Sequence, residues 1–178
     1  PAESNERWQK YWYNTRSYAL FTLLAGVREV DDIEPLSEPK GLPQDISDQL
    51  KAEWEDARGD GHTPSYFYLD ELINAANKNS TLISYVGIKN YQEFKKQGYP
   101  NNWGGYFNPK LFISNEEMDK LVKLMCFAND DTIDKSYTEI IFEIPNNKMC
   151  RSFFENLENI AKLDPDPKNI RCVFWFDN

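Results

Sequence analysis

Residues 137–144 read Tyr-Thr-Glu-Ile-Ile-Phe-Glu-Ile, and this alternation decides how the C-terminal third of the chain folds. Every second residue is apolar, namely Ile140, Phe142 and Ile144. The alternate positions hold Glu139, Ile141 and Glu143. A period of two places these apolar side chains on one side of an extended backbone. The stretch therefore predicts a β-strand with one buried face and one wetter face.

The segment that follows predicts a helix and then a second strand. Phe153, Leu157 and Ile160 recur at helical spacing, and the Asp-Pro-Asp-Pro run at 164–167 stops the helix. Residues 170–176 are apolar on both faces, which is typical of a strand in the interior of a sheet. Strand, helix and strand in this order predict a right-handed crossover with the two strands parallel.

Further helices are expected upstream. Residues 18–30 are mostly apolar and follow Ser17, a good N-cap residue, while residues 47–58 form a charged pattern typical of a surface helix. Residues 69–76 repeat apolar side chains at helical spacing, and a capping box begins a helix at Ser114.

Between these helices, residues 31–43 carry three prolines and residues 98–110 are rich in Gly, Asn and Pro, so both predict loops. Residues 81–88 fit a strand or a helix equally well. The pattern as a whole predicts an α+β fold: a single domain over residues 1–178, with helices packed on a small sheet that includes the C-terminal parallel β-α-β unit.

Composition limits the classes of function. The chain has 178 residues, 40% of them hydrophobic, and no apolar run approaching the roughly 20 residues that span a bilayer. Its three cysteines lie far apart, which favours free, reduced thiols and a cytoplasmic location. A net charge of −9 disfavours direct binding of nucleic acid and suits a basic or nucleic-acid-binding protein partner.

The only histidine of the chain lies in Gly59-Asp60-Gly61-His62. In an extended backbone Asp60 and His62 would share a face, so the carboxylate could orient the imidazole for acid/base catalysis, or both could bind a metal. A metal would need further ligands from elsewhere, such as Asp177, and we expect no cofactor. The alternative is a loop histidine that caps a backbone group or faces water.

Three other groups of residues could bind a partner or ligand. Asp177 and Asn178 follow the last strand, where parallel sheets bind ligands, or they form a solvated tail. Aromatic residues on the Gly-rich loop could stack on a ligand or a partner protein, or could close over the core. They include Tyr99, Trp103 and Tyr106.

The third group is a row of carboxylates on the predicted surface helix, Glu53, Glu55 and Asp56. The row could imitate phosphate spacing for a nucleic-acid-binding partner, although such rows are often solvated helix faces. The chain lacks the glycine-rich phosphate-binding and dinucleotide motifs and the Gly-x-Ser-x-Gly motif of hydrolases.

Four blocks of sequence are scattered over nearly the whole chain: Tyr-Ala-Leu-Phe-Thr-Leu-Leu-Ala-Gly-Val-Arg at 18–28, Pro-Leu-Ser-Glu-Pro-Lys-Gly-Leu-Pro at 35–43, Asp-Gly-His at 60–62 and Val-Phe-Trp-Phe-Asp-Asn at 173–178. Together these blocks resemble a family of small bacteriophage and prophage proteins. In the family the third block carries a second histidine, and Pro64 stands at that position here. The resemblance implies a phage accessory protein but transfers no activity.

These observations lead to one main hypothesis and two alternatives. The main hypothesis is a phage-type interaction protein that binds and inhibits a host factor, such as a host defence component, through an acidic and aromatic surface. The first alternative is a hydrolase or transferase acting on a nucleotide or phosphate with Asp60 and His62. The second is a protein that sequesters a small nucleotide by stacking it on the Trp103 loop.

Overall fold

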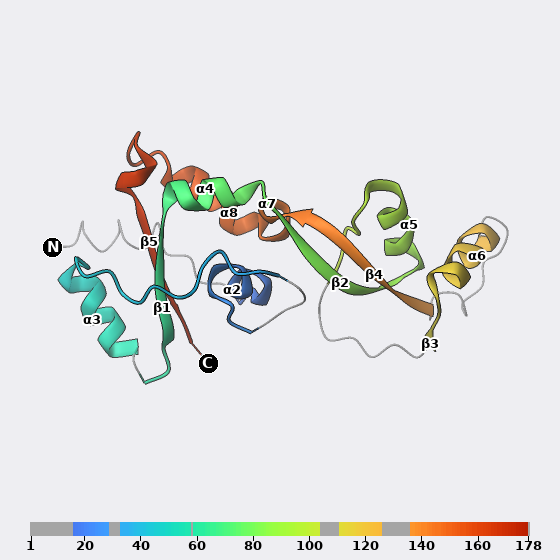
Figure 1. Ribbon diagram of the computed structural model, residues 1–178, viewed down its shortest axis with the longest axis horizontal. Helices are drawn as coiled ribbons and strands as arrows, with labels where there is room; N and C mark the ends of the chain where they lie inside the picture. Colours follow the sequence, from blue (N-terminus) through green and yellow to red (C-terminus); the bar gives the residue numbers. More distant parts are fainter. Residues whose placement is uncertain (1–15, 29–32, 58, 104–110, 126–135, 178) are drawn as a thin grey trace. The chain divides into compact units, whose positions relative to one another are not determined.

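The computed structural model describes residues 16–28, 33–57, 59–103, 111–125 and 136–177. The chain forms two compact units, here called unit 1 (up to Lys78 and from Pro145) and unit 2 (Asn79–Ile144). Both units combine helices with short strands (Figure 1), which confirms the α+β class. None of the described helices is long and apolar enough to cross a bilayer.

Unit 1 is built around a two-stranded antiparallel ladder (Figure 1). Strand β1 (His62–Tyr68) pairs with β5 (Arg171–Phe176), and Phe67 lies opposite Cys172. The helices of this unit are α2 (Tyr18–Ala25), α3 (Asp48–Ala57), α4 (Leu69–Ala76), α7 (Asn146–Met149) and α8 (Arg151–Ile160), with a 3₁₀ turn η2 (Pro167–Asn169). The core of the unit is formed by apolar side chains of these helices and of both strands, including Leu23, Phe67, Leu72, Phe154 and Phe176.

The helix predicted over residues 18–30 is present but shorter. The Ser17 hydroxyl accepts a hydrogen bond from the Leu20 amide, so the predicted N-cap is confirmed. Helix α2 then ends at Ala25 because Gly26 adopts a left-handed conformation with φ 65° and its amide closes the last turn. A glycine in this position ends many helices, since it adopts the left-handed region without steric cost.

The predicted parallel pairing of the last two strands is wrong. Strand β4 (Ser136–Pro145) belongs to the sheet of unit 2, whereas β5 pairs antiparallel with β1. Strand β5 is also not interior to a large sheet, because the ladder of unit 1 has only two described strands. Both faces of β5 are apolar because each packs against a different part of unit 1: Phe176 lies in the core, and Trp175 packs on Trp54 of α3.

Unit 2 contains a three-stranded sheet in the order β2-β4-β3. Strand β2 (Asn79–Gly87) resolves the ambiguity of residues 81–88 in favour of a strand, and β3 (Leu111–Phe112) pairs parallel with β4. The side chain of Asn79 bonds that of Glu143, and Gly87 lies against the Tyr137 ring. Strands β2 and β4 therefore run in opposite directions.

One face of β2 and β4 is buried. The alternation predicted for β4 is confirmed, since Ile140, Phe142 and Ile144 are buried while the residues between them are exposed. Buried side chains also come from the two helices of the unit, α5 (Ile88–Gln97) and α6 (Asn115–Met125), through Tyr91 and Met118. The predicted capping box is confirmed as well: Ser114 and Glu117 exchange amide-to-side-chain hydrogen bonds.

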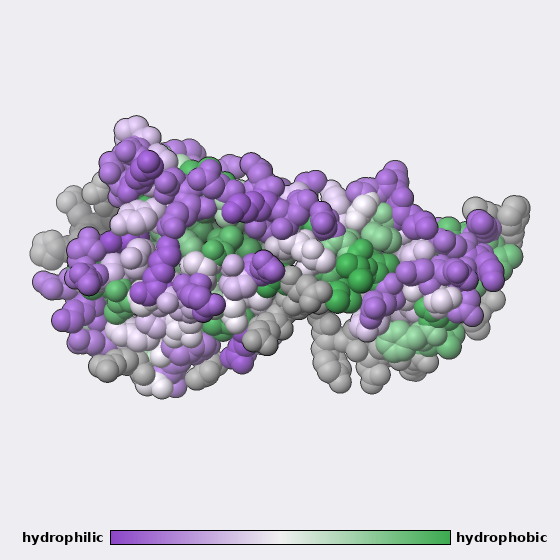
Figure 2. Space-filling view, in the orientation of Figure 1, coloured by the Kyte–Doolittle hydropathy of each residue, from purple (hydrophilic) through white to green (hydrophobic). Residues whose placement is uncertain are grey.

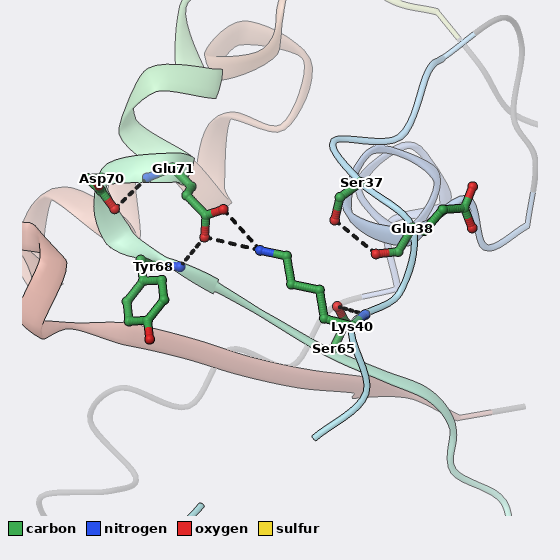
Figure 3. A network of polar contacts seen from close by, with 7 residues as sticks. All are labelled: Ser37, Glu38, Lys40, Ser65, Tyr68, Asp70 and Glu71. Carbon is green, nitrogen blue, oxygen red and sulfur yellow. Dashed lines mark hydrogen bonds and ion pairs between the residues drawn. The ribbon is translucent and has the colours of Figure 1, made fainter. Parts of the chain in front are cut away.

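The proline-rich loop of unit 1 is tied to β1 and α4 by Lys40 (Figure 3). The Lys40 amide donates a hydrogen bond of 3.0 Å to the buried hydroxyl of Ser65. Its ammonium group lies 3.0 Å from a Glu71 carboxylate oxygen and 4.5 Å from the centre of the Phe67 ring. The same carboxylate accepts a hydrogen bond from the Tyr68 amide, which would otherwise be unpaired at the start of α4. One acidic side chain thus joins three segments.

These contacts make the stability of unit 1 depend on pH. Partial burial would raise the pKa of Glu71, but the Tyr68 amide and the Lys40 ammonium outweigh it and hold the pKa below its usual value of 4.5. A carboxyl group whose pKa is lower in the folded state than in the unfolded state stabilises the fold at pH values above its unfolded-state pKa. This stabilisation is lost as the pH falls through the folded-state pKa. We expect Glu71→Gln to unfold at lower urea concentration than the parent at pH 7, and the difference to disappear in acid.

The matched control for that measurement is Glu38→Gln. In Figure 3 the Glu38 carboxylate points away from Lys40, so its removal should leave the urea midpoint nearly unchanged at both pH values. An equal loss of stability in the Glu38 and Glu71 variants would show that general charge, and not the Lys40 contact, is responsible.

A buried amide closes the junction between α4 and α7. Asn146 is almost fully buried, its side chain donates to the Ala75 carbonyl at 3.0 Å, and its own amide donates to the Lys78 carbonyl at 2.9 Å. Removing the side chain leaves a buried carbonyl without this donor, which costs about 1–3 kcal/mol. Asn146→Ala should lower the free energy of unfolding by this amount in urea titrations. Asn147→Ala, which removes an exposed bond to Asn77, should cost much less.

Candidate functional site

His62 is the first residue of β1 and lies opposite Phe176 in the ladder. Its Nδ1 atom is 2.9 Å from the Thr63 hydroxyl oxygen, and its ring centre is 6.0 Å from that of Phe176. The side chain is half-buried. The local arrangement therefore gives the imidazole a hydroxyl neighbour and an aromatic neighbour, both within unit 1.

Thr63 marks an irregularity in the ladder beside His62. The register shifts between His62 and Ser65, so β1 carries an extra residue there, and Thr63 has φ 52°. A β-branched residue with positive φ is an outlier whose strain must be offset by its surroundings. Pro64 follows in the bulge, where the missing amide costs no ladder hydrogen bond. The Asp60–His62 stretch is thus a turn and a bulge rather than a regular extended segment.

Gly61 explains much of the Asp-Gly-His block. Its amide donates a hydrogen bond of 2.6 Å to the Ala57 carbonyl at the end of α3. A Cβ atom on Gly61 would lie 2.9 Å from that carbonyl oxygen and 3.2 Å from the Trp54 ring. Only glycine lets the backbone approach the helix end this closely. The block therefore turns the chain sharply from α3 into β1.

The turn and the end of β5 lie at the same end of the ladder (Figure 1). Because His62 faces Phe176, Asp177 follows directly beyond the pair, and Asp60 lies in the turn before it. Both carboxylates are on exposed residues. The sequence analysis offered Asp177 as a possible further ligand beside Asp60 and His62, and the antiparallel ladder does bring the three residues to one end of unit 1. The parallel sheet edge expected around Asp177 is absent, because β5 pairs antiparallel with β1.

The predicted carboxylate row also belongs to this end of unit 1. Trp54 of α3 packs edge-on against Trp175, with ring centres 5.7 Å apart, and this contact fixes the helix on the ladder. Glu55 and Asp56 are exposed at the C-terminal end of α3, and Glu53 is half-buried with a side-chain contact to Gln49. The ion pairs within the described parts of the chain involve none of these carboxylates.

The described residues contain no cluster of three or more His, Cys, Asp or Glu side chains able to hold a metal ion. The two described cysteines are free thiols, as predicted. Burial raises the pKa of Cys150 to about 12 and that of Cys172 to about 11. Both are thus protonated near neutral pH and are poor nucleophiles there, because the thiolate is the reactive form. Cys126 lies outside the described residues.

The aromatic loop belongs to unit 2. Trp103 is half-buried and packs edge-on against Phe142 with ring centres 6.1 Å apart, so its ring covers the core of the sheet. Tyr99 is half-buried beside the buried Pro100. This is the packing that the second interpretation of the loop predicted for Trp103. Tyr106 and Asn178 lie outside the described residues.

Sequence reasoning missed two features with functional potential. It left His62–Tyr68 without an assigned strand, because the proline and the bulge obscure the alternation. It also passed over several exposed apolar residues of unit 2, among them Tyr85, Phe112 and Ile141. The signal for Ile141 was present, since an isoleucine stands on the wetter side of the alternating strand.

No family model, curated protein or solved structure matches this chain. The similarity to phage proteins noted in the sequence therefore stays a prediction.

Substitution of Gly61 tests whether the turn requires glycine. Gly61→Ala places a methyl group against a backbone carbonyl and an anchored tryptophan, and overpacking of this kind costs about 1–3 kcal/mol. We expect a lower urea midpoint and a change in tryptophan fluorescence, since Trp54 must move. Gly59→Ala is the control, because a methyl group there meets nothing within 4 Å. Equal stability of the two variants would contradict the close approach at Gly61.

Proposed function

We propose that this chain is an interaction protein of the bacteriophage type, which binds and inhibits a basic host factor, such as a host defence component. The observation that supports it best is the set of exposed carboxylates at one end of unit 1. Glu55 and Asp56 on α3 lie near the turn that holds Asp60, and Asp177 follows the paired end of β5. We call this set the acidic end.

Electrostatics suits the acidic end to a basic partner. The chain carries a net charge of −9, so its field attracts basic proteins and repels phosphate backbones. Complementary charge at an interface speeds the encounter and selects the partner more than it raises the affinity. The contact between Trp54 and Trp175 holds α3 in place, so its carboxylates are presented on a fixed helix.

The reactive groups give less support to a hydrolase or transferase. The two described thiols are protonated near neutral pH, so they add no nucleophile to His62 and the Thr63 hydroxyl beside it. Trp103 packs on Phe142, which also leaves less support for a nucleotide stacked on that ring. The binding function therefore ranks first among the three hypotheses.

A capture experiment with matched charge variants tests the proposal. The immobilised full chain is exposed to a bacterial lysate in low salt. We expect it to retain a basic protein that elutes as the salt concentration rises, because added ions screen exposed charges over about 10 Å at 0.1 M. Glu55→Gln combined with Asp56→Asn should weaken this capture. Glu155→Gln combined with Glu158→Gln removes two carboxylates from another helix of unit 1 and should retain it.

His62→Ala separates this proposal from the enzyme hypothesis. Under the proposal it captures the same protein, because the imidazole is not part of the acidic end. Loss of a phosphatase or nucleotide-hydrolysing activity in His62→Ala would favour the enzyme instead. Equal capture by the two double variants, or a partner insensitive to salt, would argue against the acidic end.

A further inference from the structure

Unit 2 presents an apolar sheet surface, here called the outer face. It is the side of β2, β4 and β3 opposite the buried face. The side chains that define it are Ile83 and Tyr85 of β2, Tyr137, Glu139, Ile141 and Glu143 of β4, and Phe112 of β3. Figure 2 shows hydrophobic surface over β2 and β4.

The outer face is more exposed than apolar side chains of this size usually are. Ile141 is 60% exposed, Phe112 55% and Tyr85 45%. An antiparallel sheet covered on one side commonly places polar residues on the other. Here four of the eight outward positions on β2 and β4, leaving aside Gly87 and Pro145, are isoleucine or tyrosine. Contiguous exposed apolar surface of this kind marks sites of interaction.

Two aromatic side chains of the outer face, Tyr85 and Phe112, contact each other. The rings of Tyr85 and Phe112 meet edge-on with centres 5.1 Å apart, although they come from different strands. The Tyr85 hydroxyl also bonds the Glu139 carboxylate, which raises the pKa of the tyrosine. Side chains that are already ordered lose little conformational entropy on binding. These two side chains are therefore already ordered before a partner binds.

The charge of the outer face selects the kind of partner. Glu139 and Glu143 lie among its apolar side chains, and both residues are exposed. Asn79 contacts Glu143, and no Lys or Arg stands at the described positions on this side of β2, β4 and β3. A partner that buries this face must cover two carboxylates, which requires cationic groups to avoid leaving a buried charge unpaired.

We infer that the outer face of unit 2 binds an amphipathic helix of another protein, with an apolar stripe flanked by Lys or Arg side chains. Helices commonly cover the open face of a sheet because each element hides its apolar side on the other. A ten-residue strand such as β4 spans roughly 33 Å, which a helix of about 20 residues matches. Apolar side chains would contact Ile141 and Phe112, and the cations would pair with Glu139 and Glu143.

A second copy of the chain fits the outer face less well. A two-fold contact places the same patch on both sides, so Glu139 and Glu143 would be buried against a surface that carries no Lys or Arg at its described positions. Like charges brought together at an interface disfavour the complex. The inference is also separate from the proposed function, since it concerns unit 2 and involves none of the carboxylates of the acidic end.

The test uses a synthetic peptide of about 18 residues, made of Leu and Lys, with the leucines at helical spacing on one side. The peptide is titrated into the isotope-labelled full chain while backbone amide resonances are recorded by NMR. We expect saturable shifts on β2, β3 and β4. A peptide with the same composition but scrambled leucine positions should bind at least about fivefold more weakly.

Two pairs of variants provide the controls. Ile141→Ser should weaken binding about fivefold or more, whereas Ile73→Ser, which changes an isoleucine of unit 1 that is 45% exposed, should not. Glu143→Gln should weaken binding and reduce its dependence on salt. Glu158→Gln on α8 should leave both unchanged.

Several outcomes would overturn the inference. Shifts on α3 instead of the sheet, or equal binding of the scrambled peptide, would mean that general acidity attracts the probe. Sedimentation showing a dimer that Ile141→Ser dissociates would identify a second copy as the occupant. A fall in thermal stability for the unbound Ile141→Ser chain as large as that for a core substitution such as Ile140→Ala would show that the chain itself covers the face.

Discussion

The antiparallel pairing of β1 with β5 is the constraint on which unit 1 depends. It joins a strand from the first half of the chain to the last strand and fixes which residues meet, since Phe67 faces Cys172 and His62 faces Phe176. The ladder alone would be weak, because two strands are marginal in water. It is stabilised on one side by the core through Phe67 and Phe176, and on the other by α3 through Trp54.

Local structure was readable from the sequence because the interactions that form it are local. The Ser114 capping box, the N-cap at Ser17 and the alternation in 137–144 each depend on residues a few positions apart, and all three are confirmed. Strand partners were not readable in this way. The crossover hypothesis paired β4 with β5 because they are neighbours in sequence, whereas their partners are chosen by packing between distant segments.

In the candidate site, too, some features could be predicted from the sequence and others could not. The residue types were found from sequence, and the ladder does bring Asp60, His62 and Asp177 to one end of unit 1. The details that decide their chemistry were not accessible, because they come from backbone geometry. Gly61 is needed for the approach of the turn to Ala57, and Thr63 takes a positive φ in the bulge. The Asp-Gly-His block resembles part of an active site, but its central residue, Gly61, is explained by the close packing of the turn against α3.

The two sides of strand β4 differ in what explains their residues. Its buried side, with Ile140, Phe142 and Ile144, has the regularity that folding requires. If folding were the only demand, polar side chains would be expected at most positions of the opposite side, because that side faces water. Ile141 departs from that expectation, and Tyr85 and Phe112 on the neighbouring strands depart with it. Since these side chains contribute little to the core, their exposure is better explained by binding than by stability.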